Sequence, residues 1–205
     1  MRNRIHSMLV ALLLFGAMSA QALPLVFTTV LAGTNEAPPN ASPGSGNATV
    51  TIDNALKTMR LQAAFTNLTG VSTVAHIHCC TLVPGADNAG VATGVPTFPG
   101  FPAGVTSGSY DWVFDMTASS SYNPSFVTAS GGTVAAAFDT LVAGFNAGTA
   151  YLNIHSSAYP GGEIRGFFQA AREQVPLPGT LVLIVMGIAG MSLGRRHIPI
   201  APTNS

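Results

Sequence analysis

The sequence predicts an all-β domain, an antiparallel β-sandwich or barrel with one short helix. Only 8% of the 205 residues are charged, while the chain contains 22 glycines and 14 prolines. Short segments with a two-residue alternation of apolar and polar side chains recur along the chain, separated by turn-forming residues. Low charge and many turn formers are typical of exported all-β proteins rather than of helical enzymes.

The first 22 residues have the pattern of a secretory signal peptide. Two arginines precede an apolar run at residues 8–18, and small residues at A-x-A spacing follow it. The run is shorter than the roughly 20 residues of a spanning helix. We therefore expect cleavage after Ala22, and we assign residues 1–22 to the signal peptide.

Residues 23–171 carry the strands of the predicted domain. The clearest strand is at residues 47–53, where Ala48, Val50 and Ile52 alternate with polar side chains. A turn at 53–55 predicts a hairpin with the next strand. The other strands are predicted at residues 25–31, 58–68, 71–78, 109–116, 151–155 and 163–169. In the strand at 109–116 the expected core face consists of Tyr110, Trp112, Phe114 and Met116.

A long loop and a helix interrupt the strands. Residues 81–106 contain Phe98 and Phe101 between three prolines, which exclude a central strand and predict a stiff, partly apolar loop. Such a loop either has a functional task or packs as a lid over one end of the sandwich. Residues 133–141 have apolar side chains at helical spacing, so we expect a helix that closes an open end of the sheet.

Three histidines are the best chemical clue in the sequence. On an extended strand His76 and His78 share one face, while Ala75 and Ile77 share the other. His155 lies opposite the apolar face of its own strand. Neutral imidazoles suit copper, zinc or nickel, so His76, His78 and His155 form a candidate metal site. The alternative is that these rings only make hydrogen bonds in a polar rim.

Cys79 and Cys80 directly follow the histidine pair. As soft ligands they would favour Cu(I) or zinc. A disulfide between neighbouring residues is a second outcome, although Cα atoms about 3.8 Å apart are closer than the roughly 4.4–6.8 Å of ordinary disulfides. Free thiols or a bond to another molecule are further alternatives.

Residues 172–205 form a predicted sorting and anchoring tail. A hydrophobic run at residues 180–193 follows Pro176 and Pro178 and precedes Arg195 and Arg196. This layout resembles the PEP-CTERM tail of Gram-negative bacteria. The resemblance implies processing by an exosortase, insertion of residues 180–193 in the inner membrane, transient or permanent, and delivery to the cell surface.

The domain itself resembles the CHRD family, first defined in chordin. The motifs that carry the resemblance are at residues 31–39, 75–78, 85–90 and 150–166. It implies a compact extracellular β-sandwich or barrel, like an immunoglobulin or superoxide dismutase domain in outline.

These patterns favour a non-catalytic surface or matrix module whose partner is an exopolysaccharide or a surface protein. Residues 23–171 contain three basic and seven acidic residues, a net charge of −4, so we expect no nucleic-acid binding. The alternative is a copper-dependent redox enzyme, because a His-x-His strand with a distant histidine resembles the copper half of Cu/Zn superoxide dismutase. The chain lacks the further histidines of that enzyme, and no nucleophile motif indicates a hydrolase.

Overall fold

The computed structural model describes residues 23–171, which correspond to the predicted β domain. The predicted signal peptide at residues 1–22 and the predicted tail at residues 172–205, with its hydrophobic run, lie outside the described residues. Within residues 23–171 no helix is both long enough and apolar enough to cross a membrane.

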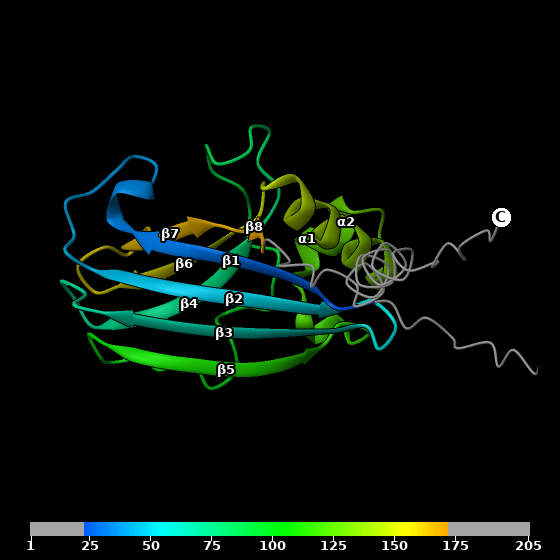
Figure 1. Ribbon diagram of the computed structural model, residues 1–205, viewed down its shortest axis with the longest axis horizontal. Helices are drawn as coiled ribbons and strands as arrows, with labels where there is room; N and C mark the ends of the chain where they lie inside the picture. The colour runs from blue at the N-terminus through cyan, green and yellow to red at the C-terminus, as the bar shows by residue number, and fades with distance from the viewer. Residues whose placement is uncertain (1–22, 172–205) are drawn as a thin grey trace, which may run out of the picture. The chain divides into compact units, whose positions relative to one another are not determined.

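The described chain consists mainly of strands, with two helices at one end (Figure 1). The strands are β1 (Leu25–Ala32), β2 (Ser45–Asp53), β3 (Thr58–Thr66), β4 (Ser72–His78), β5 (Gly108–Asp115), β6 (Tyr151–Ser156), β7 (Ile164–Phe167) and β8 (Gln169–Ala170). The helices are α1 (Pro124–Ala129) and α2 (Val134–Ala147), and short 3-10 turns occur at Gly33–Asn35 (η1) and Ser119–Ser121 (η2). The predicted all-β class is confirmed.

All strands belong to one antiparallel sheet that curls into a half-barrel. Its order is β4-β6-β7-β1-β2-β3-β5, and β8 pairs with β1. The expected hairpins β2–β3 and β6–β7 are both present. β4 follows β3 in the chain, but it lies at the far edge of the sheet and pairs with β6. This crossover brings the two histidine-bearing strands side by side.

The concave face of the sheet holds the hydrophobic core. The two-residue alternation of β2 and β3 directs Val50 and Leu61 inward, and neither side chain is exposed. α2 closes one end of the half-barrel, where Phe145 stacks on Phe27 with 5.2 Å between ring centroids. The Thr133 hydroxyl caps the helix by accepting a hydrogen bond from the Ala136 N–H.

Two details differ from the expectation for the helices. The predicted helix at 133–141 continues to Ala147 and ends at Gly148, which has a φ of 67° and therefore favours glycine. α1 was not predicted, although its sequence carries the usual start signal: the Asn123 side chain caps the Ser125 N–H, and Pro124 occupies the first helical turn.

The loop between β4 and β5 packs as a lid along the open edge of β4. Backbone N–H groups of Ala92 and Gly104 donate hydrogen bonds to carbonyls of β4, which would otherwise be unpaired. Phe98 and Phe101 are buried, and Phe98 stacks on Tyr110 of β5 at 5.7 Å. The loop therefore links the two edges of the half-barrel, whereas the lid interpretation placed it over one end.

Trp112 does not join the core as expected. Tyr110, Phe114 and Met116 are buried, but Trp112 remains 43% exposed. β5 is an edge strand, and the indole lies beside the loop at residues 94–99, in a shallow pocket rather than under a neighbouring strand. Strict alternation therefore overestimates burial at this edge.

Candidate metal centre

The three histidines meet on the convex face of the sheet. His76 and His78 project from β4, and His155 projects from the adjacent strand β6. Their ring centroids lie 5.9–6.3 Å apart in all three pairs. The opposite faces of both strands carry Ala75, Ile77, Leu152 and Ile154, all with no exposed surface. The predicted placement of the histidines opposite the apolar rows is confirmed. Loops also cover the face that carries the histidines, so His76 and His78 are buried.

Each ring forms one hydrogen bond with a backbone carbonyl. His76 Nε2 lies 2.6 Å from the Pro96 oxygen, and His78 Nδ1 lies 2.9 Å from the Ala89 oxygen. His155 Nδ1 lies 2.8 Å from the Pro160 oxygen. A carbonyl only accepts, so in the neutral ring each of these nitrogens carries the proton. The other nitrogen of each ring must then present a lone pair.

The three lone-pair nitrogens are buried and have no hydrogen-bond partner. These atoms are His76 Nδ1, His78 Nε2 and His155 Nε2. One potential ligand nitrogen from each ring lies within 4.8 Å of the other two. A point exists within about 2.8 Å of three atoms so spaced, while Zn–N bonds are about 2.0–2.1 Å. Small ring movements would therefore complete a three-histidine site.

Burial keeps His76 and His78 in the neutral form that binds metals. Desolvation lowers the pKa of His78 to about 4, although the Ala89 carbonyl opposes the shift. Desolvation also lowers the pKa of His76, against the effect of the Pro96 carbonyl. A metal ion at this position would compete with few protons near neutral pH.

Aromatic and cationic side chains surround the centre. His78 stacks on Tyr151 with 4.8 Å between nearly parallel rings. The Tyr151 hydroxyl lies within hydrogen-bond distance of both backbone groups of Ala89, the residue that also holds His78. The Arg165 guanidinium also lies over the Tyr151 ring, 4.8 Å from its centroid. Ala89 thus connects its loop to the centre through two side chains, the His78 ring and the Tyr151 hydroxyl.

A buried ion pair lies next to the centre, and reasoning from residue patterns did not single it out. The Arg165 guanidinium lies 3.8 Å from the Glu36 carboxylate, and both side chains are less than 8% exposed. Arg165 also donates hydrogen bonds to the backbone oxygens of Asn35 and Asp87. Burial raises the pKa of Glu36 to about 7, although Arg165 and Asn153 lower it. The only signal in the sequence was that both residues lie in the motifs of the family resemblance.

Glu163 is a second buried carboxylate that pattern reasoning missed. It has no exposed surface. It accepts hydrogen bonds from the Ser42 hydroxyl and from the Thr69 backbone N–H. Burial raises the pKa of Glu163, but these hydrogen bonds and others together lower it by more, so the net pKa is below the ordinary value. Glu163 connects three loops and is a structural residue.

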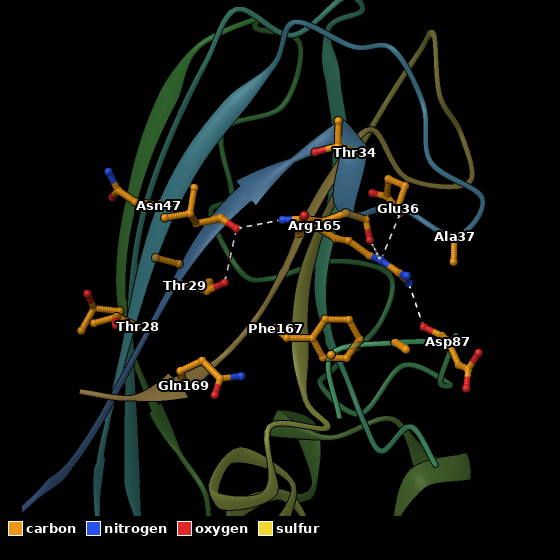
Figure 2. Close-up of a pocket in the computed structure, with 16 residues that line it drawn as sticks. Thr28, Thr29, Thr34, Glu36, Ala37, Asn47, Asp87, Arg165, Phe167 and Gln169 are labelled. Atoms are coloured by element: carbon orange, nitrogen blue, oxygen red, sulfur yellow. Dashed lines mark hydrogen bonds and ion pairs between the residues drawn. The ribbon is translucent and has the colours of Figure 1, made fainter. Parts of the chain in front are cut away.

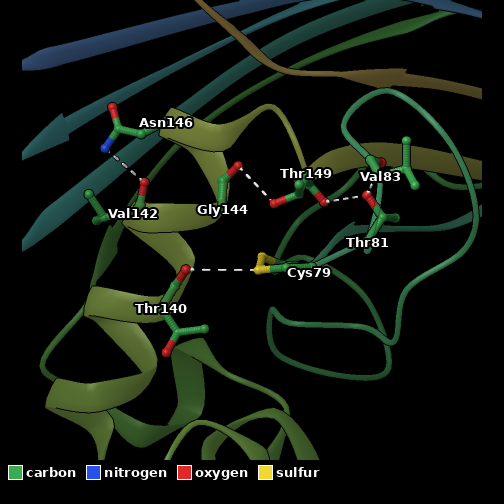
Figure 3. The surroundings of a disulfide bond; sticks show 9 residues. Cys79, Thr81, Val83, Thr140, Val142, Gly144, Asn146 and Thr149 are labelled. Carbon is green, nitrogen blue, oxygen red and sulfur yellow. Dashed lines mark hydrogen bonds between the residues drawn. A yellow bond between two sulfur atoms is a disulfide. The ribbon is translucent and has the colours of Figure 1, made fainter.

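The structure joins Cys79 and Cys80 in a disulfide beside helix α2 (Figure 3). Cys79 follows His78 on the extended chain, so its side chain points to the opposite, core face, where it is 5% exposed. Both sulfurs pack against α2 at Gly144. Because the sulfurs are bonded to each other, they offer no thiolate to a metal. The expectation of cysteine ligands is therefore wrong for the oxidised protein.

The comparisons with known proteins identify one family. The CHRD domain family matches residues 27–168, which include β1 without its first two residues and all of β2 to β7, while β8 lies just beyond the match. No curated protein and no solved structure matches the chain significantly. The match covers more than half of the chain, and it spans both the histidine cluster and the Glu36–Arg165 pair. The chain belongs to the CHRD domain family.

Proposed function

We propose that this protein is an exported, non-catalytic module of the cell surface or extracellular matrix that binds one transition metal ion, copper or zinc, through His76, His78 and His155. One observation carries the proposal: three buried imidazole nitrogens, each deprotonated because its ring partner donates to a carbonyl, converge without partners. Leaving three such atoms unpaired costs free energy that a metal ion would recover.

The export part of the proposal is supported by the two ends of the sequence. The signal peptide at residues 1–22 would direct secretion, and the PEP-CTERM-like tail at 172–205 would be processed by an exosortase-type enzyme. Residues 180–193 would hold the protein in the inner membrane until then. Mass spectrometry of the protein from its native host tests both points: the mature chain should begin at Leu23 and lack the hydrophobic run.

A non-catalytic role fits the ligand set better than the redox alternative. Residues 23–171 contain only these three histidines, so a bridging histidine and a second metal site cannot be formed as in Cu/Zn superoxide dismutase. With the sulfurs paired, nitrogen ligands alone remain, and these suit Zn²⁺ and Cu²⁺. Superoxide turnover by the copper-loaded protein would favour the enzyme instead.

Titration of the purified full-length protein with Zn²⁺ and Cu²⁺ tests the site directly. We expect one equivalent to bind. His78→Gln and His155→Gln should each weaken binding by more than the roughly 10- to 100-fold that loss of an outer-shell partner causes. Asn146→Ala, an exposed position on α2, serves as a matched surface control. Equal binding by wild type and His155→Gln would contradict the three-histidine site.

A further inference from the structure

An open groove of about 900 Å³ crosses the convex face of the sheet (Figure 2). β1, β2, β7 and β8 form its floor, and the segments at residues 34–37 and 85–87 form its walls. A second depression of about 430 Å³ shares Asn47 and Thr49 with the groove and continues over β3 and β5. The two hollows therefore adjoin each other along one face, with Asn47 and Thr49 between them.

The lining of the groove is polar, and its one charged side chain outside the Glu36–Arg165 ion pair is the exposed Asp87 carboxylate. Hydroxyl and amide groups dominate, from Thr28, Thr29, Thr34, Asn35, Asn47, Thr49 and Gln169. The one cation of the lining, Arg165, is paired with Glu36 and donates to backbone oxygens. No lining cation is left for an anion, so phosphate groups and acidic polymers do not fit this surface. The groove matches a neutral ligand that both donates and accepts hydrogen bonds.

One aromatic ring lies among these polar groups. Figure 2 shows the Phe167 ring between Gln169 and Asp87, and the side chain is only partly buried. The ring packs at 4.9 Å against Tyr151, and the Arg165 guanidinium lies 5.5 Å from its centroid. A ring held so firmly offers a flat apolar surface to the C–H groups of a ligand at little cost in entropy.

The shape of the site favours a chain rather than a small molecule or a peptide. From β1 to β5 the convex face spans three strand spacings, about 14 Å. A peptide added to a sheet needs a free strand edge, but β1, β2 and β3 are paired on both sides. Drug-like ligands need mostly apolar linings. A neutral, polyhydroxylated chain satisfies the hydroxyls, the amides and the aromatic ring together.

We propose that this groove binds a neutral polysaccharide, with sugar hydroxyls bonded to Asn47, Thr49 and Gln169 and one sugar ring stacked on Phe167. The inference rests on the proposed role as a surface or matrix module, and it names the ligand class and the residues for that role. It does not depend on the metal, because none of the three histidines lines the groove.

Calorimetric titration of the full-length protein, kept in solution by a sugar-free polyoxyethylene detergent, tests the proposal. The probes are hexasaccharides of glucose, galactose and mannose with different linkages, together with oligogalacturonate as an anionic control. We expect at least one neutral probe to bind and the anionic probe not to bind. Asn47→Ala, Thr49→Val and Phe167→Leu should each weaken binding by about tenfold, the loss of one or two good contacts.

Matched controls separate the groove from the rest of the surface. Asn146→Ala removes an exposed amide on α2, and Trp112→Ala removes an exposed aromatic ring outside the groove. Both should bind as wild type does. Thr49→Val keeps the shape of the residue, so a folded variant is available even if another substitution unfolds the domain. Failure of every neutral probe, or equal losses in the control variants, would overturn the proposal. The metal titration would remain unaffected by either outcome.

Discussion

Removing the carboxyl group of Glu36 should change how the metal-free protein responds to acid. Burial raises the pKa of Glu36 from 4.5 to about 7, and it lowers the pKa of His78 from 6.5 to about 4. The folded protein therefore binds more protons than the unfolded chain at Glu36 between pH 4.5 and 7. At His78 the unfolded chain binds more protons between pH 4 and 6.5.

The two groups oppose each other in sign. Glu36, whose pKa is raised on folding, contributes stability that is present below pH 4.5 and lost as the pH rises through 7. His78, whose pKa is lowered on folding, contributes stability that is present above pH 6.5 and lost as the pH falls through 4. Each shift corresponds to an upper bound of roughly 3 kcal/mol, and we expect about half of that because water and relaxation screen buried charges. In wild type the two effects largely cancel between pH 7 and 4.5.

Urea unfolding in EDTA between pH 4.5 and 7.5 measures the effect. Glu36→Gln should make the free energy of unfolding fall by about 1–2 kcal/mol more than in wild type as the pH drops from 7 to 4.5. His78→Gln should make it rise relative to wild type over the same range, because the loss of stability due to His78 is absent. Comparing slopes with wild type removes the contributions of all other carboxylates. Parallel slopes for wild type and Glu36→Gln would show that Glu36 titrates normally and that the reasoning is wrong.

Three further predictions concern the packing around the centre. Gly144→Ala would place a Cβ 2.7 Å from the Cys80 sulfur, so it should destabilise the protein by about 1–3 kcal/mol in thermal or urea unfolding, while Asn146→Ala should not. Replacing Cys79 and Cys80 together by serine should leave the Zn²⁺ affinity within about threefold of wild type, because the sulfurs lie on the opposite face of the strand. A large loss of affinity would indicate that the cysteines take part in metal binding. Phe98→Ala should cost about 3–5 kcal/mol of stability by leaving a cavity in the lid, and it should also weaken Zn²⁺ binding, because the lid supplies two carbonyls to the histidines; unchanged metal affinity would contradict that link.

Much of the fold follows from local patterns. The alternation at residues 47–53 predicted β2 and its buried face, because side chains of an extended strand must point to alternate sides. The same rule placed His76 and His78 together and opposite Ala75 and Ile77. Helix α2 was predicted from its spacing, while α1 was missed because one and a half turns are too short to show a period. Trp112 was misplaced because alternation does not reveal which strand is an edge.

The candidate site was only partly predictable. The sequence identified the three histidines by their residue type and their position on strands. It could not determine which ring nitrogen carries each proton, because the acceptors are backbone oxygens of Ala89, Pro96 and Pro160, which any residue could supply. Nor could it decide between disulfide and thiolate for the cysteines. That outcome depends on the redox conditions of the compartment in which the protein folds.

By itself, then, the sequence determined the strands, their faces, the three candidate ligands and the family, since these depend on neighbours a few residues apart. Only the tertiary structure decided that β4 crosses to pair with β6, which brings His155 to the pair on β4. It also decided that Glu36 and Arg165 are buried together and that a polar groove lies beside them. Strand order and loop packing are set by contacts between residues far apart in the chain, and no local pattern encodes which of those contacts gives the lowest free energy.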